Sequence, residues 1–111
     1  MPIGVIEVPY GNVSNVFVLS VSLTPSQVAA TTAAQQTFTI SGLQVGDVIA
    51  DVSYQGAWTV AVSEVNYWVP SNNTIGISYY NSTASGVTPP SGSYWVTVLR
   101  PAAGQVVNII Q

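Results

Sequence analysis

The chain has no lysine, no histidine and no cysteine, and it carries very little charge of either sign. Its 111 residues include one basic side chain, Arg100, and four acidic ones, so 5% of the residues are charged. In an average soluble domain, roughly a quarter of the residues are charged. The absence of cysteine excludes disulfides. Without cysteine, the sequence gives no indication of whether the protein is found in an oxidising or a reducing compartment. A surface that binds phosphates needs several cations, so a single arginine argues against nucleic acid as a partner.

The missing residue types also remove most catalytic chemistry. Nucleophilic catalysis needs a base beside the nucleophile, usually His or Lys, and the sequence has neither. Carboxylate pairs are the remaining acid–base option, but Asp47 and Asp51 on one strand would lie about 13 Å apart. Glycosidase carboxylates need a spacing of roughly 5 to 9.5 Å. Asp47 or Asp51 could also meet Glu64 across a sheet, although the spacing does not require it. We therefore expect no enzyme.

Metal and cofactor sites are not expected either. The chain has no soft metal ligands and no Asp-rich loop of the calcium-binding kind. Asp47 follows Gly46, and an aspartate in such a turn commonly accepts hydrogen bonds from nearby backbone amides. We therefore expect Asp47 to be a turn residue, and we assign no catalytic, cofactor-binding or metal-binding residue and no cofactor.

Long hydrophobic runs are absent as well. Hydrophobic residues make up 48% of the chain, but no stretch approaches the roughly 18 uninterrupted apolar residues that a membrane span needs. Residues 1–11 lack the cationic start and the continuous apolar run of a secretory signal. We therefore expect no secretory signal and no membrane partner.

What the sequence does contain is alternation of period two, in segments rich in Val, Ile, Thr, Tyr and Trp, the residues that favour strands. We predict strands over residues 16–23, 36–40, 48–54, 58–68, 74–80 and 93–100. Turns are predicted over residues 42–47 and 70–73, and a loop over 86–92. The alternation changes near Glu64-Val65, which predicts a bend or a short loop. Residues 25–35 are predicted to be mostly loop with one turn of helix.

The spacing of these segments predicts the fold class. Short strands separated by turns at roughly ten-residue intervals are typical of an all-β antiparallel β-sandwich, either jelly-roll or immunoglobulin-like. The length fits a single domain over residues 1–111, with a core at 12–100 and apolar extended termini. The N-terminal arm covers 1–11 and the C-terminal arm 101–111. Such apolar arms pair as outer strands of the same sandwich or reach into a neighbouring subunit, and both interpretations stay open.

Three Trp and six Tyr raise the possibility of a binding surface. The candidate rings are Trp58, Tyr67, Trp68, Tyr79, Tyr80, Tyr94 and Trp95. Rings at adjacent positions of a strand point to opposite faces, so about half of them belong to the core. The outward half could stack on sugars or enter a protein interface, and the scarcity of Lys, Asp and Glu favours the protein interface. A monomer with so little charge is also prone to associate.

Two long segments carry a resemblance to a known group. The first reads LTPSQVAATTAAQQTFTISGLQVGDVI from Leu23, and the second reads NNTIGISYYNSTASGVTPPSGSYWVTVLR up to Arg100. Together they resemble small β-structured proteins encoded beside the structural genes of tailed bacteriophages. Gly42, Gly46 and Asp47 match the turn of that group, and the loop is matched by Asn81, Thr83, Ala84, Val87, Thr88, Pro89 and Pro90. These motifs are structural and not catalytic.

The resemblance implies a virion component on the capsid exterior, made in the host cytoplasm. It implies a capsid decoration (cement) or head-fibre type of protein, with the major capsid protein and copies of itself, as a dimer or trimer, as partners. No site residue is carried over. Members of this group often lie within longer chains, and the shorter length here favours decoration over a fibre shaft. A carbohydrate-binding module used for host-surface adhesion and a tail or fibre domain remain as alternatives.

Overall fold

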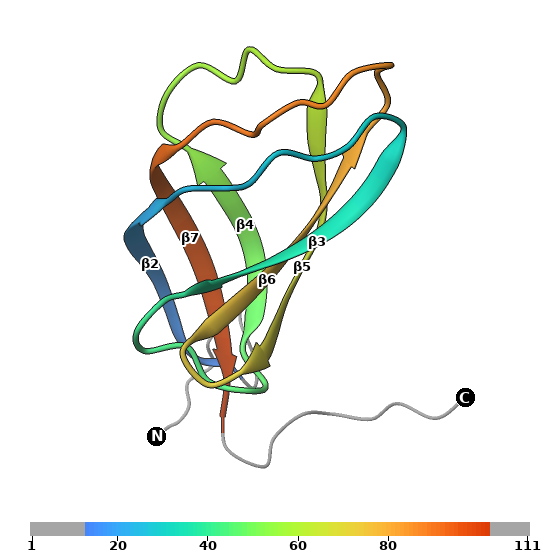
Figure 1. Ribbon diagram of the computed structural model, residues 1–111. Coiled ribbons are helices and arrows are strands. Elements are labelled where there is room, and N and C mark those ends of the chain that lie inside the picture. The colour runs from blue at the N-terminus through green and yellow to red at the C-terminus, as the bar shows by residue number, and fades with distance from the viewer. Residues whose placement is uncertain (1–12, 103–111) are drawn as a thin grey trace, which may run out of the picture.

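The protein is built from two three-stranded sheets packed face to face, as the computed structural model in Figure 1 shows for residues 13–102, the part of the chain that the structure describes. The strands are β2 (Val13–Leu23), β3 (Thr32–Thr39), β4 (Val48–Tyr54), β5 (Val62–Ser71), β6 (Thr74–Asn81) and β7 (Gly92–Pro101). One sheet has the order β2-β7-β4 and the other β3-β6-β5, and all four pairings are antiparallel. The predicted all-β antiparallel sandwich is confirmed.

The core lies between the two sheets and is supplied mainly by alternate residues of the central strands β6 and β7. Successive side chains of a strand point to opposite faces, so every second residue faces inward. The inward side chains of these strands are 0% exposed: Ile75, Ile77, Tyr79, Tyr94, Val96 and Val98. Both inward rows agree with the alternation that the sequence predicts. The predicted N-terminal arm, residues 1–11, lies outside the described residues, as do residues 103–111 of the C-terminal arm, whose first residue, Pro101, belongs to β7.

The turn before β4 has the conformation that its glycines predict. Gly42 and Gly46 have φ angles of 99° and 100°, a region that favours glycine because it has no Cβ. The Gln44 amide donates to Asp47 Oδ2 at 2.9 Å, and the Asp47 amide donates to the Gln44 carbonyl at 3.0 Å. The predicted role of Asp47 as a turn residue is confirmed.

The N-terminal end of β3 differs from the prediction. β3 begins at Thr32, within the segment 25–35 that was expected to be loop with one turn of helix. The preceding residues form no helix, because Val28 instead makes an isolated antiparallel bridge to Val87 of a distant loop. Tertiary pairing therefore overrides the helix preference of the alanines in this segment. In the described part of the chain, no helix is long and apolar enough to cross a membrane.

β5 also differs from the prediction, at both ends. It begins at Val62 and not at residue 58, because the Trp58 indole N–H donates to the Val62 carbonyl at 2.9 Å and folds the loop back. At the other end it continues through Pro70, which was expected to lie in a turn. Proline fits there because β5 is an edge strand whose register shifts between Trp68 and Ser71. A further shift between Glu64 and Asn66 is the predicted bend.

Candidate functional site

Charged side chains gather at two places in residues 13–102, and the first is an ion pair between Asp47 and Arg100. The Arg100 guanidinium donates to Asp47 Oδ1 at 2.8 Å and to Oδ2 at 2.7 Å, and also to the Gly42 carbonyl at 2.8 Å. The Asp47 side chain is only 2% exposed. The hydrogen bond from Arg100 holds the pKa of Asp47 below its ordinary value, although burial acts in the opposite direction. The pair ties the end of β7 to the turn before β4, which is a structural role.

The second place is the Glu64 carboxyl group on β5. The Tyr67 hydroxyl donates to Glu64 Oε1 at 2.8 Å. Within residues 13–102, neither Glu64 Oε2 nor the hydroxyl of Tyr79, which lies opposite Glu64 in the register, has a hydrogen-bond partner. Burial raises the pKa of Glu64; the Tyr67 hydrogen bond opposes this and the nearby Asp51 charge reinforces it. Of the predicted carboxylate pairings, Asp51 with Glu64 is therefore electrostatically coupled, while Asp47 is paired with Arg100.

No cluster of three or more His, Cys, Asp or Glu side chains that could hold a metal ion occurs among the described residues. Burial also raises the pKa values of Tyr67 and Tyr79, so both phenols stay protonated at neutral pH. The Tyr67 hydroxyl therefore acts as a hydrogen-bond donor to Glu64 and is not a phenolate.

The Glu64 cluster predicts a stability change with a definite sign. Because the folded-state pKa of Glu64 lies above its ordinary value, its contribution to stability is complete below the unfolded-state pKa. That contribution is lost as pH rises through the folded-state pKa. In the wild-type protein the urea midpoint should therefore fall as pH rises above the ordinary Glu pKa of 4.5, and Glu64→Gln should make this fall smaller. Asp51→Asn, which removes the nearby charge that reinforces the shift, should move the fall to lower pH but keep it. An unchanged profile in Glu64→Gln would contradict the assignment.

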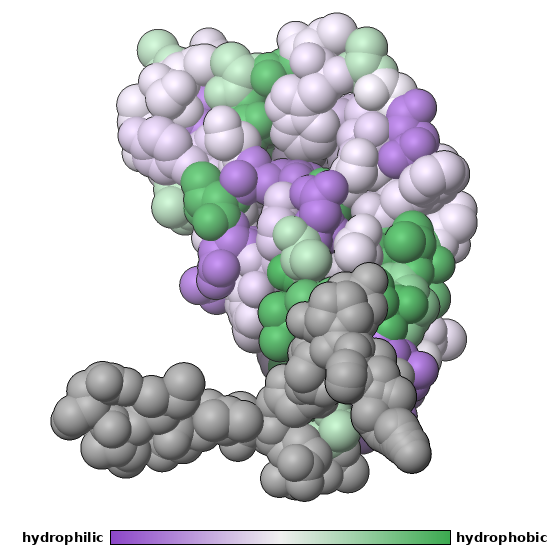
Figure 2. All heavy atoms as spheres, turned by 180° about the vertical axis from the view of Figure 1, so that it is seen from behind, coloured by the Kyte–Doolittle hydropathy of each residue, from purple (hydrophilic) through white to green (hydrophobic). Residues whose placement is uncertain are grey.

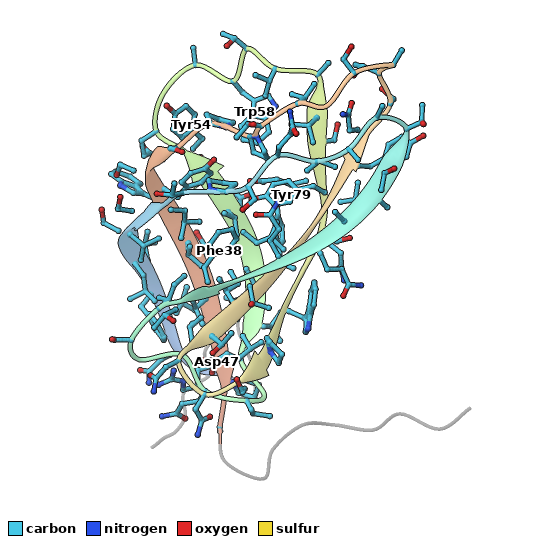
Figure 3. All side chains as sticks on the ribbon, viewed as in Figure 1. Phe38, Asp47, Tyr54, Trp58 and Tyr79 are labelled. Carbon is cyan, nitrogen blue, oxygen red and sulfur yellow. The ribbon has the colours of Figure 1, made fainter. Side chains whose placement is uncertain are left out.

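The candidate aromatic rings divide between core and surface as adjacent positions should. Tyr79 and Tyr94 are 0% exposed, whereas their neighbours Tyr80 and Trp95 are 43% and 51% exposed. Figure 3 shows Tyr79 between the sheets and Trp58 beside Tyr54 at the upper end, and these two rings make an edge contact with centroids 6.3 Å apart. The outward rings Tyr80 and Trp95 lie on different sheets, so they do not form a common platform.

The outer surface of the β2-β7-β4 sheet carries exposed apolar side chains on both sides of a middle row formed by Val18, Thr97 and Asp51. We call the apolar side chains of this surface the apolar face and define it by Val16, Val18, Val48, Trp95 and Leu99. The two valines of β2 are 45% and 55% exposed, Val48 is 50% exposed and Trp95 is 51% exposed. Register places Leu99 of β7 between Val16 and Val48, so three apolar side chains form one row across the sheet. Figure 2 shows hydrophobic surface in the lower part of the molecule as seen from behind.

The outer surface of the β3-β6-β5 sheet has a different character. Its middle row consists of Gln35, Ser78 and Asn66, which are aligned by register across the three strands. The Trp68 ring lies on one side of this row, against Gly76, where an added Cβ would come within 2.5 Å of the indole. Tyr80 lies on the other side of the row. This surface therefore combines amide and hydroxyl groups with two rings.

The sequence predicted that about half of the rings face outward, but it did not show which ones, and it missed two features of the surface. The valines of the apolar face come from separate strands, and only the strand order brings Val48 next to β7. The partner of Asp47 was also missed, although a single basic residue and a turn aspartate were signals that could have suggested it. Comparison with known proteins adds no identity, since no family model, no curated protein and no solved structure matches this chain.

Proposed function

We propose that this protein is a non-enzymatic virion structural protein, a capsid decoration or cement protein. It binds the outer shell formed by the major capsid protein and stabilises contacts between capsomers. The observation that supports this proposal best is the apolar face, with four large side chains about half exposed on one sheet. The resemblance of residues 23–100 to phage structural proteins is the reason for proposing that this surface binds a virion shell.

The apolar face has the properties of a protein-binding surface. Interface cores are depleted of charged residues and enriched in aromatic ones, and tryptophan is among the residues that contribute most on burial. Trp95 lies on the central strand of its sheet, opposite Ser20 and Ser53. The backbone of a paired central strand is already ordered, so binding adds mainly the entropic cost of fixing the Trp95 side chain.

Co-sedimentation with shells assembled from the major capsid protein tests this proposal. We expect Trp95→Ser to weaken shell binding by roughly 30-fold, the effect of losing about 2 kcal/mol at an interface hot spot. The matched control is Tyr80→Ser, because Tyr80 is similarly exposed but lies on the other sheet. Wild-type protein that stays in the supernatant, or two variants that bind as well as wild type, would contradict the proposal.

A carbohydrate-binding module is the second candidate, and the polar surface of the β3-β6-β5 sheet favours it. Aromatic rings flanking amides are suited to stack on sugar rings and to hydrogen-bond their hydroxyls. In this case oligosaccharides from the host surface would shift the tryptophan fluorescence, and Trp68→Ser would abolish the shift. Trp95→Ser would retain it, which is the reverse of the pattern expected for shell binding.

A further inference from the structure

The four edge strands of the sandwich differ in how they are protected from pairing with another chain. Exposed edges are commonly blunted by charge, proline or bulges. β4 carries Asp51 and a register shift between Ile49 and Asp51. β5 carries Glu64, Pro70 and two register shifts. Both strands therefore have the features that discourage edge-to-edge association, and they lie close to each other on one side of the sandwich.

The other two edges, β2 and β3, carry neither charge nor proline, and the one register shift in β2 lies at its N-terminal end, between Val13 and Asn15. β3 has no charge, no proline and no register shift along its length. β2 has neither charge nor proline, and its register is regular from Asn15 to Leu23. Among the described strands, each pairs on one side only. The outward residues of β3 are mainly polar, such as Gln35 and Thr37, whereas β2 presents Val16 and Val18, so β2 is the more apolar of these two edges among the described strands.

The distribution of charge permits two β2 strands to approach each other. The chain has a net charge of −3, and like-charged copies repel each other in general. In the described residues, however, Asp47 is neutralised by Arg100, and the other two carboxylates, Asp51 and Glu64, lie on β4 and β5. β2 and β4 are opposite edges of the same sheet. The uncharged edge therefore faces away from the charged one.

We propose that β2 of one copy pairs antiparallel with β2 of a second copy around a two-fold axis. The β2-β7-β4 sheets of the two copies then form one six-stranded sheet with the order β4-β7-β2-β2-β7-β4. Directly opposite residues of antiparallel strands share a face, so a register that sets Val16 against Val18 of the second copy groups four valines. An isologous contact of this kind closes on itself and stops at a dimer. The inference rests on the proposed function in one respect, because the joined sheet presents a doubled apolar face to the shell.

Single cysteines test the arrangement cleanly, because the chain contains no cysteine of its own. The test pair is Val18→Cys on β2 and Val48→Cys on β4, two positions of similar exposure on the same face. Strands are spaced about 4.8 Å apart, so the β2 strands would be neighbours and the β4 strands about 24 Å apart across the joined sheet. A short bismaleimide should therefore cross-link Val18→Cys into dimers and leave Val48→Cys monomeric on a denaturing gel.

Light scattering over a concentration range provides the second measurement. Wild-type protein should have the mass of a dimer. Val18→Lys should raise the dimer dissociation constant by roughly tenfold or more, because two like charges would meet near the axis. Val48→Lys, as the matched control, should remain a dimer.

Several outcomes would overturn the inference. Wild-type protein that is monomeric at every concentration excludes the β2 dimer. If deletion of residues 2–10 then creates a dimer, the edge is occupied by that segment of the same chain. A trimer, or equal cross-linking at Val18→Cys and Val48→Cys, places the contact elsewhere. None of these outcomes decides the proposed function, because shell binding by a monomer or a trimer would still be measured by co-sedimentation.

Discussion

Replacing Arg100 with methionine is expected to destabilise the fold by roughly 3–5 kcal/mol, the usual cost of removing one partner from a buried ion pair. The Asp47 carboxylate is 2% exposed and would keep only the Gln44 amide among its hydrogen-bond donors. The Gly42 carbonyl would lose its bond to the guanidinium as well. Urea unfolding followed by tryptophan fluorescence at neutral pH measures this loss directly.

The same variant should change how stability depends on pH. The pKa of Asp47 lies below its ordinary value in the folded protein, chiefly because of the Arg100 hydrogen bond. The stability that this provides is present above the unfolded pKa of about 4 and is lost as pH falls through the folded-state pKa. The difference between wild type and Arg100→Met should therefore be largest near neutral pH and should shrink in acid.

A double variant separates the cost of leaving the Asp47 charge unpaired from the cost of losing the Arg100 side chain itself. Replacing both members, as Asp47→Leu with Arg100→Met, removes the buried unpaired charge and should recover part of the stability that Arg100→Met loses. The turn would still lack the Gln44 hydrogen bond, so recovery should be incomplete. A loss below about 1 kcal/mol in Arg100→Met, typical of an exposed pair, would show that the contact contributes little.

The parts of this fold that could be predicted from sequence are those set by local alternation and turn chemistry. The strand over residues 48–54 has the predicted bounds. A run of alternating strand formers follows a turn that requires positive φ at two positions, and both positions are glycines. Segments whose conformation depends on distant partners were missed. β3 extends back to Thr32 along the full length of β6, and Trp58 folds toward Val62, and neither contact leaves a periodic signal.

The candidate surface shows the same division. That one of Tyr94 and Trp95 faces outward follows from their adjacent positions, since adjacent residues of a strand face opposite sides, and the structure shows that it is Trp95. That it lies on the same face as Val16, Val18 and Val48 does not follow from the sequence, because β2, β4 and β7 come together only through the order β2-β7-β4. Non-consecutive strands pair through long connections, and their register is decided by how the two sheets pack.

Asn81→Ala is expected to cost roughly 3 kcal/mol, because one side chain satisfies several buried groups at once. The Asn81 amide donates to the Val28 carbonyl at 3.0 Å and to the Ser85 carbonyl at 2.8 Å. Its carbonyl oxygen accepts from the Thr83 amide at 2.9 Å and from the Thr83 hydroxyl at 2.7 Å. A polar group left unsatisfied in the interior costs about 1–3 kcal/mol, and Asn81 is 0% exposed.

The region that Asn81→Ala destabilises should be as informative as the free energy that the substitution costs. Asn81 joins the loop after β6 to the loop before β3, where the Val28 and Val87 amides each donate to the other's carbonyl. Hydrogen exchange of these two amides should accelerate in Asn81→Ala more than exchange in β4. Asn66→Ala, at an exposed amide, should stay within about 0.5 kcal/mol of wild type. If Asn81→Ala leaves Val28 and Val87 as protected as in wild type, the bridge holds the loops together without it, and the cost of the substitution must come from the cavity alone.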